Sequence, residues 1–194
     1  MFQNHRNSRG FTLVELAIVL IVIGIILGMV FKGRQLIDSA KVKSLEANYN
    51  KILTAVNTFY DRYGYYPGDG CGNVTTVTSI SSCNGTKDGR LTNANEQNAF
   101  WTLLIDITGI LPKSERKTIN GNEWSVVYTS ATGKNYLQVT SMDTRYVCVL
   151  DKKIDDSDSD TGNIHITTRA NVYDETTDCW SLNRIETARF HLLP

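Results

Sequence analysis

The sequence predicts an α+β fold, in which a long N-terminal helix packs against an antiparallel β-sheet head with disulfide-closed loops. Three observations lead to this prediction. An apolar run over residues 11–31 continues as apolar residues at helical spacing as far as Tyr63. Short segments rich in β-branched and aromatic residues begin at residue 124. Four cysteines lie in polar sequence around these elements.

The first predicted element is the apolar segment of residues 11–31. Its 21 residues match the roughly 20 residues that a helix needs to cross a bilayer. The apolar region of a secretory signal is shorter, about 7–15 residues, and its cleavage site follows it. Here the plausible cleavage site, Arg9-Gly10-Phe11, precedes the run. We therefore expect residues 1–10 to be a removable leader and residues 11–31 to be the transmembrane half of a longer helix.

The second half of this helix is predicted over residues 32–63, as an amphipathic segment. Apolar residues recur there at spacings of three and four, while charged and amide side chains fill most other positions. No proline precedes Pro67, so nothing forces a break, and Gly64 suits a left-handed helix cap. The apolar stripe consists of Leu45, Tyr49, Ile52, Leu53, Val56, Phe59, Tyr60 and Tyr63.

The remaining residues, 64–194, are predicted to form a globular α+β head. A loop runs to about Leu91, and a short amphipathic helix follows over residues 95–111. Because short turns separate the later strand-like segments, we expect an antiparallel sheet, with the apolar stripe of residues 45–63 covering one face. The predicted strands are residues 124–128, 136–140, 145–150, 164–168 and 184–191.

One acidic residue, Glu15, interrupts the apolar run. A charged side chain inside hydrocarbon costs roughly 2.5–3.5 kcal/mol on insertion scales. A helix that carries such a cost normally provides a partner for the charge, so Glu15 is the first candidate functional residue.

Residues 10–16, Gly-Phe-Thr-Leu-Val-Glu-Leu, follow a short basic leader and open the apolar run. This arrangement resembles the type IV pilin and pseudopilin family. The resemblance implies that a prepilin peptidase cuts between Gly10 and Phe11 and methylates the new amine of Phe11. It also implies a long helix packed on a four- or five-stranded antiparallel sheet. In an assembled bundle, we expect the Glu15 carboxylate to pair with the Phe11 amine of a neighbouring subunit.

The chain departs from this family at one position of the helix. Many pilins carry a proline just past its middle, where this sequence has Lys32. We therefore expect a smoother helix, or one softened at Gly33.

The predicted function is that of a structural subunit in a type IV pilus or a type II secretion pseudopilus. The alternative is a minor or tip pilin that acts as an adhesin, a DNA-uptake module or a substrate-binding module. The resemblance implies other pilins, the prepilin peptidase, an assembly platform and an ATPase as partners. It places the subunit in the inner membrane with a periplasmic head, and later in the filament. The sequence shows no catalytic residue set, so an enzyme is not predicted.

The charge balance gives no strong nucleic-acid signal. The full chain has 20 basic and 20 acidic residues. Loss of residues 1–10 would remove two arginines and leave a net charge of −2. A bulk electrostatic attraction to nucleic acid is therefore not expected.

The cysteines at positions 71, 83, 148 and 179 allow three disulfide pairings. An even number in an exported chain favours structural disulfides. We favour Cys71–Cys83 and Cys148–Cys179, because both pairs close short loops in polar sequence.

An acid-rich run, residues 155–162, contains Asp156, Asp158 and Asp160 at alternating positions. Such spacing supplies the oxygen ligands that calcium prefers. The run departs from the EF-hand pattern, because its glycine falls one place late and Thr167 stands where that loop has glutamate. We expect a solvated acidic loop, with a calcium loop as the alternative; no other cofactor is predicted.

Overall fold

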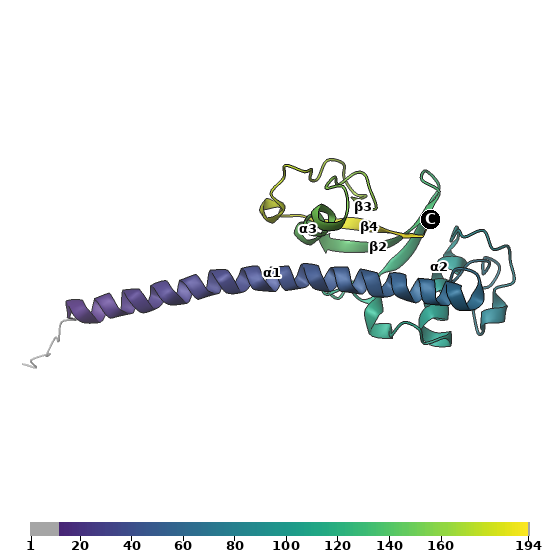
Figure 1. The fold of residues 1–194 in the computed structure, drawn as a ribbon, viewed down its shortest axis with the longest axis horizontal. Coiled ribbons are helices and arrows are strands. Elements are labelled where there is room, and N and C mark those ends of the chain that lie inside the picture. Colours follow the sequence, from purple (N-terminus) through teal and green to yellow (C-terminus); the bar gives the residue numbers. More distant parts are fainter. Residues whose placement is uncertain (1–11, 194) are drawn as a thin grey trace, which may run out of the picture. The chain divides into compact units, whose positions relative to one another are not determined.

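The structure is a computed structural model that describes residues 12–193. Its first element is a continuous helix, α1, over Leu13–Tyr63 (Figure 1). The helix is unbroken through Lys32 and Gly33, in agreement with the smooth form expected there. Contacts between residues divide the chain into two compact units, with the boundary after Ala40.

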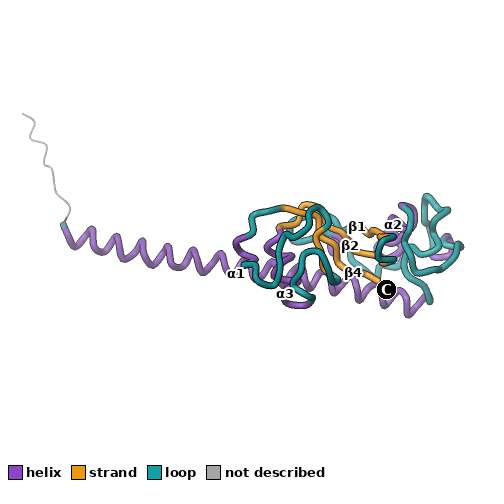
Figure 2. Tube along the Cα trace, turned by 90° about the horizontal axis from the view of Figure 1, so that it is seen from above, coloured by secondary structure: helices purple, strands orange, loops and turns teal. Residues whose placement is uncertain are grey.

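The head contains a four-stranded sheet in the order β1-β2-β4-β3. Figure 2 labels three of its strands, β1, β2 and β4. All neighbouring strands are antiparallel. The C-terminal strand β4 lies between β2 and β3, so strands that are distant in sequence are neighbours. The strands are β1 Ser125–Thr129, β2 Lys134–Asp143, β3 Ile164–Ile166 and β4 Ile185–Leu193.

The register of the strands collects apolar side chains on one face of the sheet. Leu137 of β2 lies opposite Phe190 of β4, and Phe190 in turn lies opposite Ile164 of β3. All three are buried. Because side chains alternate along a strand, this pairing forms a continuous apolar face.

The second half of α1 covers this apolar face. The rings of Tyr49 and Phe190 are 5.5 Å apart, and the Tyr49 hydroxyl donates a 2.6 Å hydrogen bond to the His191 carbonyl. Trp124 closes the cluster with its ring 5.2 Å from Phe190. The pilin-like α+β fold predicted from the sequence is therefore confirmed. The buried residues of α1 are Val42, Leu45, Asn48, Tyr49, Ile52, Ala55, Val56 and Phe59.

The predicted helix over residues 95–111 is shorter in the structure. Helix α2 spans Ala94–Trp101, and a π-helical turn continues it over Thr102–Ile107. Asn93 caps α2, since its side chain accepts from two backbone amides of the first turn. Short 3₁₀ turns lie at Ile80–Ser82, Lys113–Arg116 and Cys179–Ser181.

The strand predicted over residues 145–150 was wrong, because these residues lie in helix α3, Thr144–Ile154. Asp143 caps this helix by accepting a 3.0 Å hydrogen bond from the Arg145 amide. Tyr146, Val147 and Leu150 are buried, at the spacing of one helical face. The β-branched and aromatic residues that favoured a strand were a weaker signal than the cap and this spacing.

Two disulfides close the loops of the head. Cys71 pairs with Cys83 and Cys148 with Cys179, which is the pairing that the sequence favoured. The first of these closes the loop that leads from α1 to α2. The buried Asp69 carboxylate orders the same loop by accepting from the Gly89 amide at 2.9 Å.

Candidate assembly site

The start of α1 holds Glu15 in a capping box with Thr12. The Glu15 Oε2 atom accepts hydrogen bonds from the Thr12 amide at 2.8 Å and from the Thr12 hydroxyl at 2.9 Å. The Thr12 hydroxyl in turn accepts from the Glu15 amide at 3.3 Å. Reciprocal bonds of this kind satisfy backbone groups that the first turn of a helix leaves free. The acid that interrupts the apolar run therefore has a partner within its own subunit.

The spacing Thr-x-x-Glu at a helix start is a known sequence signature of the capping box. Thr12 could thus have been identified from the sequence as the residue that orients Glu15. The predicted processing residues Gly10 and Phe11 lie outside the described residues.

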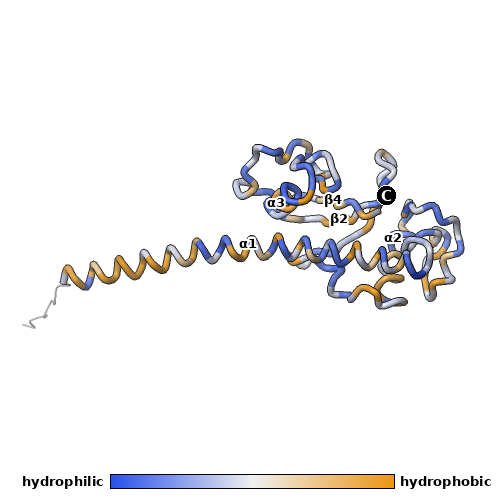
Figure 3. Tube along the Cα trace, in the orientation of Figure 1, coloured by the Kyte–Doolittle hydropathy of each residue, from blue (hydrophilic) through white to orange (hydrophobic). Residues whose placement is uncertain are grey.

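Beyond Glu15, the first half of α1 exposes its apolar side chains on all sides. It is long and apolar enough to span a membrane, and its most apolar 18-residue window is 0% buried. Figure 3 shows this segment as an almost continuous hydrophobic stretch. A large exposed apolar surface marks a site of contact with membrane or protein. The side chains of Leu13, Leu20, Met29 and Phe31 are among the most exposed.

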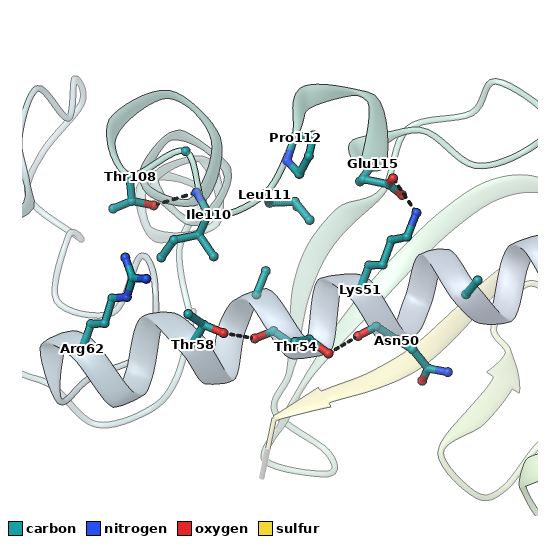
Figure 4. Close-up of a pocket in the computed structure, with 13 residues that line it drawn as sticks. Asn50, Lys51, Thr54, Thr58, Arg62, Thr108, Ile110, Leu111, Pro112 and Glu115 are labelled. Carbon is teal, nitrogen blue, oxygen red and sulfur yellow. Dashed lines mark hydrogen bonds and ion pairs between the residues drawn. The ribbon is translucent and has the colours of Figure 1, made fainter.

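A second surface feature lies in the head, as a groove of about 790 Å³ beside α1 (Figure 4). One wall is the helix from Ala47 to Arg62, and the other is the segment from Thr108 to Pro112 together with Glu115. Glu115 fixes this segment to α1, because its carboxylate accepts from Lys51 at 2.7 Å and from Asn48 at 2.9 Å. These hydrogen bonds lower the pKa of Glu115 below its ordinary value.

The acid-rich loop uses the predicted ligands for its own turns. Asp156 accepts from the Asp158 amide at 3.2 Å, and Asp158 accepts from the Asp160 amide at 2.9 Å. The Asp160 carboxylate accepts from the Asn171 amide at 2.9 and 3.0 Å. Bonds between a short acidic side chain and an amide two residues later are typical of Asx turns.

A different group of acids lies close together in this region. Ligand atoms of Asp151, Asp155 and Asp156 all lie within 4.8 Å of one another. Asp151 is fully buried and accepts from the Tyr173 hydroxyl at 2.8 Å and the Ser157 amide at 3.1 Å. Burial, together with the charges of Asp155 and Asp156, raises the pKa of Asp151 to about 6. These carboxylates already accept hydrogen bonds from donors of the chain itself, which favours the expected acidic loop over the calcium alternative.

Comparison with known proteins assigns the N-terminal segment. Residues 5–31 match the prokaryotic N-terminal methylation motif. A search of solved structures found the major type IV pilin PilA1 from Clostridium difficile, at 15% sequence identity and a TM-score of 0.43. That match covers 81% of this chain and 98% of the other. A search of curated proteins found no match.

The methylation motif and the fold together define a type IV pilin-like protein. The motif lies at the start of a long apolar helix, and the second half of that helix packs on an antiparallel sheet. This confirms the resemblance based on residues 10–16.

Proposed function

We propose that this chain is a processed subunit of a type IV pilus or type II secretion pseudopilus. Residues 1–10 are the leader, and a prepilin peptidase cuts between Gly10 and Phe11 and methylates the Phe11 amine. Residues 11–31 then hold the subunit in the inner membrane, with residues 32–63 and the head of residues 64–194 on the periplasmic side. An assembly platform and its ATPase transfer the subunit into a helical filament with other pilins.

The observation that carries this proposal is the charge at the start of an uncovered apolar helix. Glu15 lies within the methylation motif, and the apolar side chains after it are exposed. In a filament, neighbouring helices cover these side chains, and the Glu15 carboxylate meets the Phe11 amine of another copy. Buried pairing of this kind sets the register between subunits more than it adds stability.

Because Glu15 also forms the capping box, two variants can separate the effect of its charge from the effect of the cap. Glu15→Ala removes both the charge and the cap, whereas Glu15→Gln keeps an oxygen that can accept from Thr12. We expect both variants to enter the membrane and lose the leader normally. Filament yield should fall at least about tenfold in both, which corresponds to about 1.4 kcal/mol per interface.

The matched controls are Thr12→Ala, which removes one capping hydroxyl, and Asp61→Ala, which removes an exposed acid of α1. Both should assemble close to wild type. The measurement is the amount of chain in sheared filaments relative to the membrane fraction. Wild-type filament yield from Glu15→Gln would show that the charge is not needed for pairing. For the processing step, Gly10→Val should keep its full-length mass in membranes, and a product ten residues shorter would contradict the cleavage site.

A further inference from the structure

One short segment of the head exposes large apolar side chains. This segment 178–185 runs from the cap of the last 3₁₀ turn to the first residue of β4. Ile185 is 69% exposed, more than any other large apolar side chain described in residues 41–193. Trp180 is 42% exposed, whereas Trp101 and Trp124 are 4% and 0% exposed. An exposed tryptophan and an exposed isoleucine in one short segment indicate a surface that contacts a partner.

The segment is held against helix α3, which lies beside β4 (Figure 1). Cys179 is bonded to Cys148 of α3. The Arg184 carbonyl accepts hydrogen bonds from the amide and the hydroxyl of Thr144, the first residue of α3, both at 3.1 Å. The two exposed apolar side chains therefore belong to an ordered part of the backbone.

The start of α3 lies close to the first residue that α1 contributes to the head. This residue is Lys41, and its Nζ donates a 3.0 Å hydrogen bond to the hydroxyl of Tyr146 in α3. Lys41 follows Phe31, the last residue of the apolar run, by ten residues, which is a rise of about 15 Å along a helix. The headgroup layer on each side of a bilayer takes up about 5–8 Å of this rise. The remaining distance of about 7–10 Å is close to the Debye length of about 8 Å, and a helix tilt of about 20° brings one side of the head nearer to the lipid.

The charges in this part of the chain suit an anionic lipid surface. Arg184 is exposed, and its guanidinium has no hydrogen bond or ion pair within residues 12–193. The Asp143 carboxylate, opposite Ile185 in the sheet, is paired with Arg145 at 2.6 Å. Residues 32–43, directly after the apolar run, contain four basic residues and one acid. Such an excess of basic residues normally lies on the cytoplasmic side, and lipid phosphates would give it a partner on the periplasmic side.

We infer that segment 178–185 rests on the headgroups of an anionic phospholipid bilayer while the subunit is stored in the membrane. Trp180 and Ile185 enter the headgroup region, where tryptophan is enriched in membrane proteins, and Arg184 binds lipid phosphate. The inference rests on the proposed storage in the inner membrane and adds a second lipid contact, which the head makes. Because assembly would remove the subunit from the lipid, this contact has to be weak and reversible.

A lipid surface fits this segment better than a protein partner does. A stable protein interface buries roughly 800 Å² on each side, and two exposed apolar side chains beside one arginine provide much less. A lipid contact does not need this area, because the apolar half of α1 already holds the head close to the bilayer at a high effective concentration.

Quenching of tryptophan fluorescence by a nitroxide tests the inference. The full chain is placed in nanodiscs of phosphatidylcholine and phosphatidylglycerol, with or without a nitroxide on the lipid headgroups. Since Trp101 and Trp124 are buried, quenching reports on Trp180. We expect the nitroxide to quench the wild-type chain and to leave Trp180→Phe unquenched. Nanodiscs of phosphatidylcholine alone, or high salt, should reduce the quenching, because both weaken the attraction between the charges.

Two variants test the charge and the apolar contact separately. Arg184→Glu should lower the equilibrium constant for lipid contact, obtained from the quenched fraction, at least about fivefold, which is the contribution of one basic residue near an anionic surface. Ile185→Ser should lower the same constant. Both residues are exposed, so both variants should keep the Tm of wild type. The matched control is Arg90→Glu, at an exposed arginine in the loop after α1, and it should leave the constant within about twofold.

The inference would be overturned by equal quenching of wild type and Trp180→Phe, or by quenching that Arg184→Glu and Ile185→Ser leave unchanged. A wild-type chain that enters the nanodiscs and shows no quenching would also overturn it and would favour a protein partner for segment 178–185. The proposed storage in the membrane is tested separately, by whether the chain co-purifies with the nanodiscs. A chain that stays outside them would remove the membrane proposal itself.

Discussion

The two units of the chain differ in the exposure of their apolar side chains. Phe31, in the first half of α1, is 70% exposed, whereas Phe190, in the sheet of the head, is 0% exposed. Both residues belong to elements with regular hydrogen bonding, so secondary structure does not explain the difference. The head completes its contacts within one chain, while the first half of α1 leaves its contacts for a membrane or another subunit. Exposed apolar side chains on such a scale indicate a surface that contacts a membrane or another protein, and not poor packing of the subunit.

The largest expected effect separates the two phenylalanines. Phe190→Ala removes a ring that packs between Tyr49 and Trp124, so it should destabilise the head by about 3–5 kcal/mol. Phe31→Ala removes a ring with no cover in the subunit and should change the stability of the head by less than about 0.5 kcal/mol. Thermal unfolding of the full chain in detergent, followed by circular dichroism, measures both. We expect Tm to fall by on the order of 10 °C for Phe190→Ala.

Phe31→Ala should have its larger effect in an assembly assay. This variant should lower the stability of filaments more than that of the head, because neighbouring helices would cover the Phe31 ring in a filament. Equal loss of head stability in the two variants would contradict the division between the units.

A smaller effect concerns the buried acid of the head. Burial raises the pKa of Asp151 from the ordinary value of 3.8 to about 6. Between these values the folded state holds a proton that the unfolded chain has released. The contribution of Asp151 to stability is therefore fully present below about pH 4 and declines as the pH rises through 6.

Asp151→Asn removes this titration. The stability of the variant relative to wild type should rise between pH 4 and pH 7 by on the order of 2 kcal/mol. Urea unfolding of the full chain in detergent at several pH values measures the difference, with Asp61→Asn as a control for an exposed acid. Parallel pH profiles for wild type and Asp151→Asn would show that Asp151 is not held in its protonated form.

The smallest expected effect is the response of the acid-rich loop to calcium. The carboxylates of Asp156, Asp158 and Asp160 already accept from backbone amides of the chain. We expect millimolar calcium to leave the Tm of the head unchanged relative to magnesium or a chelator. A stabilisation by calcium alone, lost in Asp156→Asn, would show instead that the loop holds the ion.

The sequence predicted correctly those elements that depend on patterns of neighbouring residues. The spacing of apolar residues from Leu45 to Tyr63, with Gly64 and Pro67 after it, located the end of α1 correctly. The segments of β1 and β2 were predicted to within a few residues. Helix α3 was missed because its valines suggested a strand, although Asp143 was available as a cap.

The groove could not be predicted, since it depends on contacts between distant parts of the chain. Glu115 reaches Asn48 across 67 residues, and nothing in the sequence near either residue indicates this pairing. The same holds for β4, which enters the sheet between β2 and β3. In contrast, the capping box of Thr12 and Glu15 is a local pattern that could have been identified.

We propose that the chain is a processed pilin and that only lipid or other subunits cover the first half of its α1. Mass spectrometry of the protein recovered from sheared filaments tests this claim most directly. We predict a chain that begins at Phe11, carries one methyl group on its terminal amine and contains two cystines. A chain that keeps residues 1–10, remains in the membrane fraction and never appears among filament proteins would contradict the account.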